Sequence, residues 1–264
     1  MSASKSSKSK NNTQSTPPEP IVILPRDPSR ASTALRPITI ERQFTKHAPG
    51  SVLVSFGDTK VIVTASVEER VPRHVHQSGN ENAGWLTAEY SMLPGATNTR
   101  GQRDRLKVSG RTAEIQRLIG RSLRAALDLS TLGQRTITID ADVIQADGGT
   151  RVAAITGGYV ALADALQRLI DDEKLLAMPI RFGIAAVSVG IVGGEVRLDL
   201  DYEEDSQAEV DANVVMTHMG EIIEFQATSE SKPYSIESLN DMLSLAKDGI
   251  AELIEIQRTI LASE

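Results

Sequence analysis

The feature that most constrains the fold of this chain is a succession of strand-rich and helical sequence that occurs twice. Residues 51–56 alternate apolar and polar side chains, a glycine-containing turn follows at residues 57–59, and residues 60–67 are rich in β-branched side chains. This pattern predicts an antiparallel hairpin. A further strand is expected at residues 135–145, and apolar residues at helical spacing predict a helix over residues 112–128.

The first round ends in an alanine-rich helix that runs to about residue 171 and contains a Gly157-Gly158 pair, which favours close packing. A helix closes the chain at residues 235–262, with Gly249 as a candidate break. Between these helices four strands are expected, at residues 182–192, 195–202, 211–217 and 221–228. We therefore predict one mixed α/β domain over residues 21–264, in which helices cover the sheets.

Composition excludes several classes of protein. The chain contains no cysteine, which excludes disulfides and thiolate metal sites. We interpret His74 and His76 as a surface pair rather than a zinc site. Residues 1–20 are rich in Ser, Lys, Asn and Pro, and predict a disordered tail without the apolar core of a secretory signal. No apolar run approaches the roughly 20 residues of a membrane span, so we expect a cytoplasmic protein with no membrane partner.

The net charge of −7 conceals an uneven distribution of charge. Residues 95–124 contain eight basic and two acidic residues, whereas residues 195–264 contain 17 acidic and 4 basic residues. One part of the chain can therefore attract polyanions while another supplies carboxylates. Residues 73–110 are polar and irregular apart from an expected strand at residues 85–93, and long segments of this kind are typically functional or mobile.

Residues 145–151 form the first segment that could carry chemistry. A strand ends there, Gly148 and Gly149 permit unusual backbone angles, and a helix begins whose free N–H groups suit an anion. Thr150 adds a hydroxyl group, and Arg151 adds a planar guanidinium group suited to phosphate oxygens. An ordinary strand-to-helix turn would explain the same residues, so this segment alone does not decide the function.

The start of the basic helix supplies the second candidate, Arg111, which is either an anion ligand or a solvated arginine. Arg117, Arg121 and Arg124 follow on one stripe of the helix. Their stripe has two further interpretations, a soluble face or a set of salt bridges to a partner subunit.

The third candidate is the acidic stretch at residues 199–211. Asp205 ends an acidic connection over residues 203–210 and Asp211 starts the next strand, so the two side chains could converge. Mg²⁺ sites commonly use one or two carboxylates together with water and substrate phosphate. Asp201, Glu203 and Glu204 are interpreted as solvated or paired, and an acidic surface loop is the alternative for the whole stretch.

Taken in order, these segments resemble the ribonuclease PH family of bacterial phosphorolytic exoribonucleases, over about residues 35–257. The matching segments are Leu35-Arg36-Pro37, residues 46–54 (KHAPGSVLV), 56–61 (FGDTKV), 87–94 (TAEYSMLP), 110–119 (GRTAEIQRLI), 137–151 (ITIDADVIQADGGTR), 202–206 (YEEDS), and Asp211 with residues 213–217 (NVVMT). So many ordered matches are far more specific than any one motif.

The resemblance implies a fold and a reaction. The fold is the α/β layout of the second domain of ribosomal protein S5, assembled into a homo-hexameric ring of three dimers. The reaction is 3′-to-5′ phosphorolysis of RNA with inorganic phosphate as co-substrate, which trims tRNA precursors and releases nucleoside diphosphates. A tRNA nucleotidyltransferase of this kind can also run in reverse and add nucleotides.

The resemblance also implies roles for residues. Phosphate-binding positions match Arg111, Gly149, Thr150 and Arg151; the two essential carboxylates match Asp205 and Asp211; RNA-gripping positions match Arg100 and Arg103. The chain departs from the family at Gly95, where an arginine is usual, and in the spacing from Arg100 to Arg111, which is two residues shorter than in some relatives. Residues 76–83 are enlarged. These departures bear on RNA binding rather than on the chemistry.

Two roles for the carboxylates and two rival functions stay open at this point. Either Asp205 gives a proton to the leaving 3′-oxygen, directly or through water, or Asp205 and Asp211 together hold Mg²⁺. The rival functions are a catalytically silent RNA-binding ring subunit and a nucleotide- or phosphate-binding metabolic enzyme. Retention of both arginines and both aspartates argues against the first, and the lack of a full glycine-rich nucleotide loop argues against the second.

Overall fold

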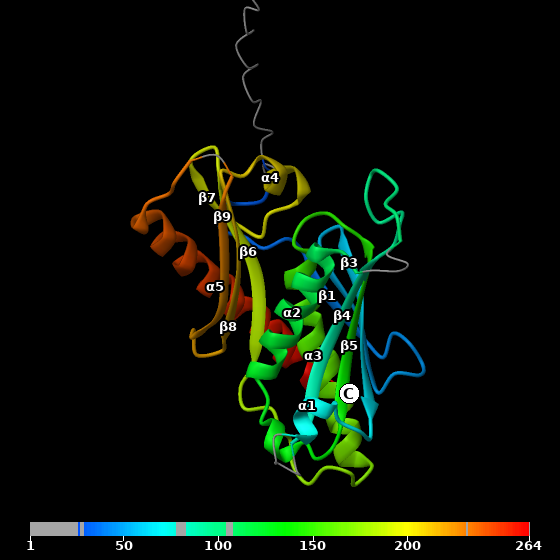
Figure 1. The fold of residues 1–264 in the computed structure, drawn as a ribbon. Helices are drawn as coiled ribbons and strands as arrows, with labels where there is room; N and C mark the ends of the chain where they lie inside the picture. Colours follow the sequence, from blue (N-terminus) through cyan, green and yellow to red (C-terminus); the bar gives the residue numbers. More distant parts are fainter. Residues whose placement is uncertain (1–25, 27–28, 78–82, 104–107, 231, 264) are drawn as a thin grey trace, which may run out of the picture.

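The computed structural model describes residue 26 and residues 29–77, 83–103, 108–230 and 232–263 (Figure 1). The expected tail at residues 1–20 and most of the enlarged segment at 76–83 lie outside the described residues. Within the described part, no helix is both long and apolar enough to cross a membrane. The chain forms two sheets with helices between and beside them, which confirms the mixed α/β layout.

The first sheet contains five strands in the order β1-β2-β3-β5-β4. Their bounds are β1 (Ile38–Arg42), β2 (Gly50–Phe56), β3 (Thr59–Glu68), β4 (Trp85–Met92) and β5 (Thr136–Gln145). The predicted hairpin is confirmed, because β2 and β3 pair antiparallel around a turn at Gly57, whose φ of 56° suits glycine. β4 joins the edge parallel to β5, which brings the end of β4 close to the end of β5.

The second sheet contains four antiparallel strands in the order β7-β6-β8-β9. Their bounds are β6 (Ile184–Val192), β7 (Glu195–Leu198), β8 (Val210–Thr217) and β9 (Ile222–Ser229). β7 is shorter than the expected strand over residues 195–202. The reason is Asp199, whose backbone takes the left-handed conformation with a φ of 53° and ends the strand.

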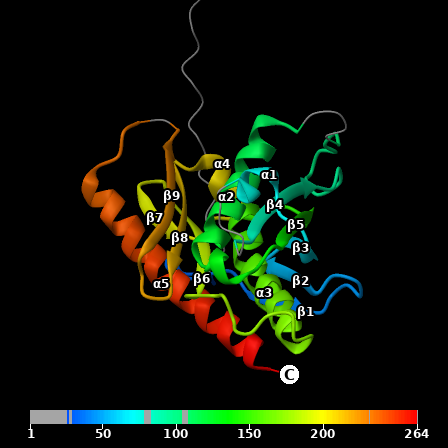
Figure 2. The same cartoon turned by 60° about the horizontal axis from the view of Figure 1, so that its bottom comes forward.

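Three long helices complete the core: α2 (Gly110–Ala125), α3 (Thr150–Asp171) and α5 (Ile236–Ala262). α3 packs against β2 and β3 of the first sheet and against β6 of the second, so it joins the two sheets in one hydrophobic core. Gly157 allows this contact, because a Cβ there would lie only 2.6 Å from a methyl carbon of Val54. Figure 2 shows α5 lying along the second sheet, with its C-terminal end near α3.

The structure corrects three expectations. α5 is one continuous helix rather than a broken one, and Gly249 instead makes room for the side chain of Leu198. The acidic connection contains a short helix, α4 (Tyr202–Gln207), which begins at an Asp201–Glu204 capping box. A four-residue helix, α1 (Arg73–His76), and a short 3₁₀ turn at Leu129–Thr131 were also not predicted.

A buried ion pair joins the two halves of the chain beside α3. Arg36, just before β1, donates from its backbone N–H and its Nε to one carboxylate oxygen of Asp199 at 2.8 and 3.0 Å. Its Nη2 contacts the other oxygen at 2.7 Å. The guanidinium group also donates to the carbonyl oxygens of Asp147 and Gly148, just ahead of α3. Both charged side chains are buried, so neither has water as a substitute partner.

We expect Asp199→Ala to lower the free energy of unfolding by about 3–5 kcal/mol, because it removes the hydrogen-bonded carboxylate of buried Arg36 and leaves mainly Asp147, 3.9 Å away, to balance its charge. Urea unfolding followed by the fluorescence of Trp85, the one tryptophan of the chain, measures the change. The matched control is Asp172→Ala, which removes an exposed pair with Arg168 and should change stability by less than about 0.5 kcal/mol. Equal effects for the two variants would contradict the prediction.

Candidate active site

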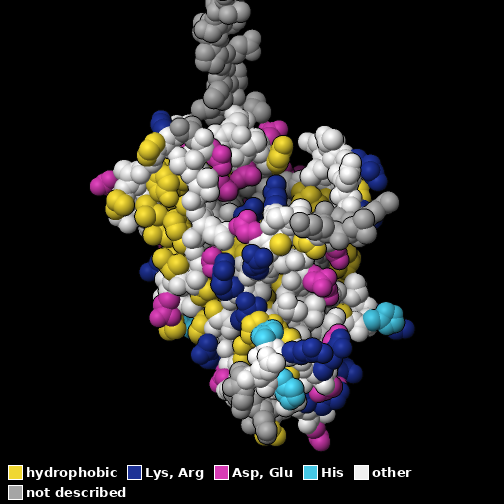
Figure 3. Space-filling view, viewed as in Figure 1, with side chains coloured by type: hydrophobic (Ala, Val, Ile, Leu, Met, Phe, Trp, Pro, Cys, Tyr) yellow, Lys and Arg dark blue, Asp and Glu magenta, His cyan; other side chains and the backbone are white. Residues whose placement is uncertain are grey.

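The ends of β4, β5, α2, α3 and α4 surround one cavity of about 670 Å³. In the space-filling view, basic and acidic side chains gather along the middle of this face, between the two halves of the molecule (Figure 3). The cavity is lined by the sequence-predicted residues Arg103, Arg111, Gly149, Thr150, Arg151, Asp205 and Asp211. The structure therefore brings together residues that are up to about 100 positions apart in the chain.

The turn between β5 and α3 presents an anion-binding end of a helix. Gly148 and Gly149 both have positive φ, at 75° and 67°, and Gly149 is the residue that caps α3. A Cβ at Gly148 would lie 2.6 Å from the carbonyl oxygen of Leu200, so only glycine fits this close approach. Because glycine has no side chain to cap the helix, the first N–H groups of α3 remain directed at the cavity.

Side chains from the first sheet hold this turn in place. Thr59, buried in β3, donates from its hydroxyl group to the carbonyl oxygen of Gly148 at 2.6 Å and accepts from the N–H of Asp147 at 2.9 Å. The hydroxyl groups of Tyr90 and Thr150 are 2.8 Å apart and hydrogen-bonded. Burial raises the pKa of the Tyr90 hydroxyl, although its bond to Thr150 and the nearby arginines oppose that shift. The tyrosine thus stays neutral and orients the Thr150 hydroxyl.

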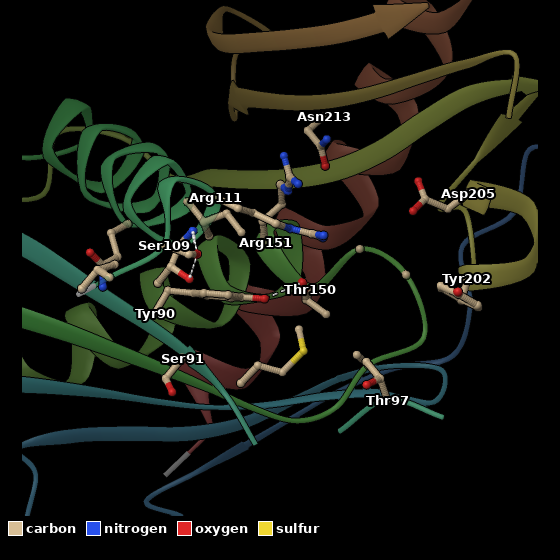
Figure 4. Close-up of a pocket in the computed structure, with 18 of the residues that line it drawn as sticks. Tyr90, Ser91, Thr97, Ser109, Arg111, Thr150, Arg151, Tyr202, Asp205 and Asn213 are labelled. Atoms are coloured by element: carbon tan, nitrogen blue, oxygen red, sulfur yellow. Dashed lines mark hydrogen bonds between the residues drawn. The ribbon is translucent and has the colours of Figure 1, made fainter. Parts of the chain in front are cut away.

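Two arginines extend into the same part of the cavity, beside Thr150 (Figure 4). Arg111 is the second residue of α2, a helix whose start is capped by the Ser109 hydroxyl, which accepts from the N–H of Thr112 at 3.1 Å. Arg151 is the second residue of α3. Two guanidinium groups and a helix N-terminus therefore point at one volume, an arrangement that can bind a phosphate group from several sides.

Asp205 of α4 and Asp211 of β8 also line the cavity. Their carboxyl groups are hydrogen-bonded to each other. Loss of water and, next, the neighbouring Asp205 together raise the pKa of Asp211 to about 6, against the opposing effect of Arg151. Asp205 is accessible from the cavity, yet the surrounding walls displace enough water to raise its pKa as well. Two carboxyl groups can share a hydrogen bond only through a proton, so this pair needs one positive charge.

Among the described residues, no group of three or more His, Asp or Glu side chains is arranged to hold a metal ion. The Asp205–Asp211 pair could supply two of the ligands of a Mg²⁺ ion. It offers two carboxylates that already need a shared positive charge, and Mg²⁺ is typically bound by one or two carboxylates with water and substrate phosphate.

The remaining acidic residues have structural roles, as predicted. Glu204 is buried and forms ion pairs with Arg26 at 2.7 Å, Arg30 at 2.7 Å and Arg197 at 3.0 Å. These arginines outweigh the effect of burial and lower the pKa of Glu204. Asp201 caps α4. The interpretation of Asp201 and Glu204 as paired residues is confirmed.

The arginine stripe on α2 forms contacts within the chain. Arg121 makes a bidentate ion pair with Glu224 of β9, with both distances at 2.8 Å. Arg124 lies 4.6 Å from the ring centre of Trp85 and donates to the carbonyl oxygen of Leu86 at 2.9 Å. His74 contacts the same Trp85 ring edge-on, and both His74 and His76 are exposed. Arg121 and Arg124 therefore tie α2 to β9 and β4.

Several cavity residues were missed by the sequence reasoning. Asn213 lines the cavity because it lies two positions beyond Asp211 on β8 and therefore shares its face. Ser188 of β6 lies directly opposite Asn213 and accepts from the N–H of Leu200 at 3.0 Å. The strand alternation starting from Asp211 could have found Asn213. Of the two predicted RNA-binding arginines, Arg103 lines the cavity, whereas Arg100 is exposed outside it.

The chain matches a family of exoribonucleases over most of its length. The model described as "3′ exoribonuclease family, domain 1" matches residues 34–166, and "3′ exoribonuclease family, domain 2" matches residues 184–249. A ribonuclease PH of Synechococcus sp. (strain JA-2-3B'a(2-13)) is 59% identical over 242 residues, which is 90% of this chain and 98% of that protein. The ribonuclease PH of Synechococcus sp. (strain JA-3-3Ab) is 58% identical over 241 residues, or 89% of this chain and 98% of that protein.

Solved structures resemble the fold at lower identity. Rice (Oryza sativa) Rrp46 superposes with a TM-score of 0.71 at 20% identity, covering 88% of this chain and 98% of that one. The Archaeoglobus fulgidus exosome with RNA bound to the active site gives a TM-score of 0.73 at 20% identity, covering 86% of this chain and 90% of that one. These superpositions confirm the fold, and the family models and the two Synechococcus relatives confirm the resemblance found in the sequence.

The carboxyl pair makes stability depend on pH. Because the folded protein holds the shared proton more tightly than the unfolded chain, the pair stabilises the fold at low pH, and this contribution is lost as pH rises through about 6. We therefore expect Asp211→Asn to raise the free energy of unfolding more at about pH 7.5 than at about pH 4.5. Urea unfolding of both proteins in buffer with a metal chelator measures this difference, and a pH-independent effect would contradict it.

Proposed function

This chain belongs to the ribonuclease PH family of phosphate-dependent 3′-to-5′ exoribonucleases, and we propose that the cavity between its two halves is where the reaction occurs. The observation that carries this proposal is the convergence of two opposite kinds of group on one volume. Arg111, Arg151 and the start of α3 lie on one side and Asp205 lies on the other, where its carboxyl group pairs with that of Asp211.

The reaction joins two anions, which repel each other in water. Inorganic phosphate attacks the phosphorus of the last phosphodiester, the bond from that phosphorus to the 3′-oxygen of the preceding nucleotide breaks, and the terminal nucleotide leaves as a nucleoside diphosphate. Arg111, Arg151 and the N–H groups at Gly149 and Thr150 hold the attacking phosphate and offset its charge. The hydroxyl of Thr150, oriented by Tyr90, donates a further hydrogen bond.

The leaving 3′-oxygen gains negative charge and needs a proton or a cation. We assign proton donation to Asp205, which would draw on the proton that Asp211, its hydrogen-bonded partner, retains up to about pH 6. Asp205 and Asp211 are equally the residues that would hold Mg²⁺. A Mg²⁺ ion bound there would supply positive charge near the leaving oxygen. The two roles are alternatives, since a carboxylate that binds a cation carries no proton.

Finer parts of the proposal concern the substrate and the assembly. The substrates are tRNA precursors with 3′ extensions, and the basic residues Arg100 and Arg103 bind their phosphate backbone with little base preference. The working form is a homo-hexameric ring in the cytoplasm. Apolar side chains on β9 and the start of α5, including Ile222 and Ile236, are exposed and would be buried by neighbouring subunits.

One assay tests the function itself. The purified protein is incubated with an RNA that carries a 3′ extension, with and without inorganic phosphate. Nucleoside diphosphates that form only with phosphate support the proposal. Binding without shortening would instead indicate a silent RNA-binding subunit. Repeating the assay after chelation separates the roles of the carboxyl pair, because activity that survives metal removal supports proton donation and activity that is lost supports Mg²⁺.

Asp205→Ala should lower turnover by about 10²–10⁴-fold, the usual contribution of a general acid or base, while RNA binding is retained. Single-turnover release of nucleoside diphosphate and a filter-binding assay measure the two quantities. Glu203→Ala, which removes an exposed carboxylate from the same helix, is the matched control and should leave turnover unchanged. Undiminished turnover in Asp205→Ala would rule out the assignment.

Arg111→Ala should raise the KM for phosphate by about 10–100-fold, because it removes charge-assisted hydrogen bonds worth about 1.5–3 kcal/mol. RNA affinity should change little. Arg117→Ala, at an exposed position of the same helix, is the control. An unchanged phosphate KM in Arg111→Ala would count against the phosphate site, whichever role the carboxyl pair has.

A further inference from the structure

We propose that Tyr202 is a stacking platform for one particular base of the RNA, that of the nucleotide whose 3′-oxygen leaves. The inference rests on the proposed function and adds a positioning residue to it. Among the described residues that line the cavity, the aromatic ones are Tyr90 and Tyr202. Tyr90 is buried and engaged by Thr150, whereas the Tyr202 side chain is 54% exposed at the cavity.

The exposed ring is held by a well-fixed backbone. Tyr202 is the first residue of α4, and its N–H donates to the carboxylate of Asp147 at 3.3 Å. The capping box formed by Asp201 and Glu204 closes the start of the helix. Glu204 in turn is anchored by three arginines in the protein interior. The backbone that carries the ring is therefore fixed at the edge of the cavity by contacts that reach into the protein interior.

The position of Tyr202 relative to Asp205 identifies the base. The two residues are three positions apart on α4, so their side chains lie on the same face of the helix. Figure 4 shows them next to each other, on the far side of the Gly148–Gly149 turn from Arg111 and Arg151. The group next to Asp205 in the reaction is the leaving 3′-oxygen. The nucleotide that carries this oxygen is the penultimate one, and its base therefore meets the Tyr202 ring.

Stacking suits an exonuclease that shortens RNA of varied sequence. Every base has an aromatic face, so a tyrosine ring can hold each new penultimate base without reading its edges. The contact would place the sugar of that nucleotide against Asp205 and keep the scissile phosphodiester in line with the bound phosphate. It uses the ring rather than the hydroxyl group, which predicts that phenylalanine can replace tyrosine.

The test pairs protein variants with RNAs that lack one base. Wild-type protein, Tyr202→Ala and Tyr202→Phe are assayed on an intact RNA, on the same RNA abasic at the penultimate position, and on one abasic at the terminal position. For the wild type, we expect kcat/KM to fall about tenfold when the penultimate base is absent, within the range for one stacked base. Tyr202→Ala should lose about as much on intact RNA and nothing further on that abasic RNA. Tyr202→Phe should have a kcat/KM on intact RNA close to that of the wild type.

Three results would overturn the inference. The first is a Tyr202→Ala rate equal to wild type on intact RNA. The second is that Tyr202→Ala and removal of the penultimate base each lower kcat/KM and that the two factors multiply when combined, which would show that the ring and this base act independently. The third is that the effect of Tyr202→Ala on kcat/KM disappears on the RNA that lacks the terminal base and not on the RNA that lacks the penultimate base. The phosphate KM should be the same in all variants, and a changed value would indicate a disturbed turn instead of a lost stack.

The same experiment keeps this inference separate from the proposed function. If wild-type protein releases no nucleoside diphosphate from intact RNA, the proposed function fails. If it does and the double-mutant comparison is additive, only the role of Tyr202 fails. Trp85 fluorescence checks that each variant is folded, and Tyr202→Leu, which keeps an apolar side chain without an aromatic face, replaces Tyr202→Ala should that variant unfold. It should show the same loss.

Discussion

The buried ion pair between Arg36 and Asp199 is the contact on which the geometry of the site depends. Arg36 precedes the first sheet and Asp199 follows β7 of the second, so their interaction fixes one half of the chain against the other. The same guanidinium group holds the carbonyl oxygens of Asp147 and Gly148. Through these bonds, the position of the Gly148–Gly149 turn depends on Arg36, which lies more than 100 positions away from it in the chain.

Charged side chains of each sign are clustered in different parts of this molecule, so the net charge does not describe the charge at the cavity. The cavity has a cationic wall made by α2 and α3 and an anionic wall made by α4 and β8. In the reaction proposed above, each wall would satisfy a different need, since one would offset the repulsion between two phosphate groups and the other would support the departure of an alkoxide. The net charge of −7 therefore says little about the ability of the protein to bind RNA.

The sequence predicted the regular elements well because their side-chain periodicity is strong. The alternation in β5 and the helical spacing in α2 correspond to buried faces. It missed α4, whose six residues are too short for a periodic signal, although the spacing of Asp201 and Glu204 is that of a capping box. The convergence of Asp205 with Arg111 and Arg151 was suggested by resemblance, but the supports of the site, Thr59 and Ser188 among them, arise from contacts between distant segments that local pattern does not encode.

The placement of α3 has a consequence for the energetics of ligand capture. Buried residues occupy almost every face of this helix, and both sheets pack against it. A helix confined in this way has no freedom to rotate or slide when an anion arrives at its first turn. The binding site is therefore preorganised, and little of the intrinsic affinity for phosphate is consumed by ordering the protein. The loss of conformational entropy of the protein when phosphate binds should therefore be small. In the proposed reaction, the site for the attacking phosphate would already be assembled at the start of each cycle.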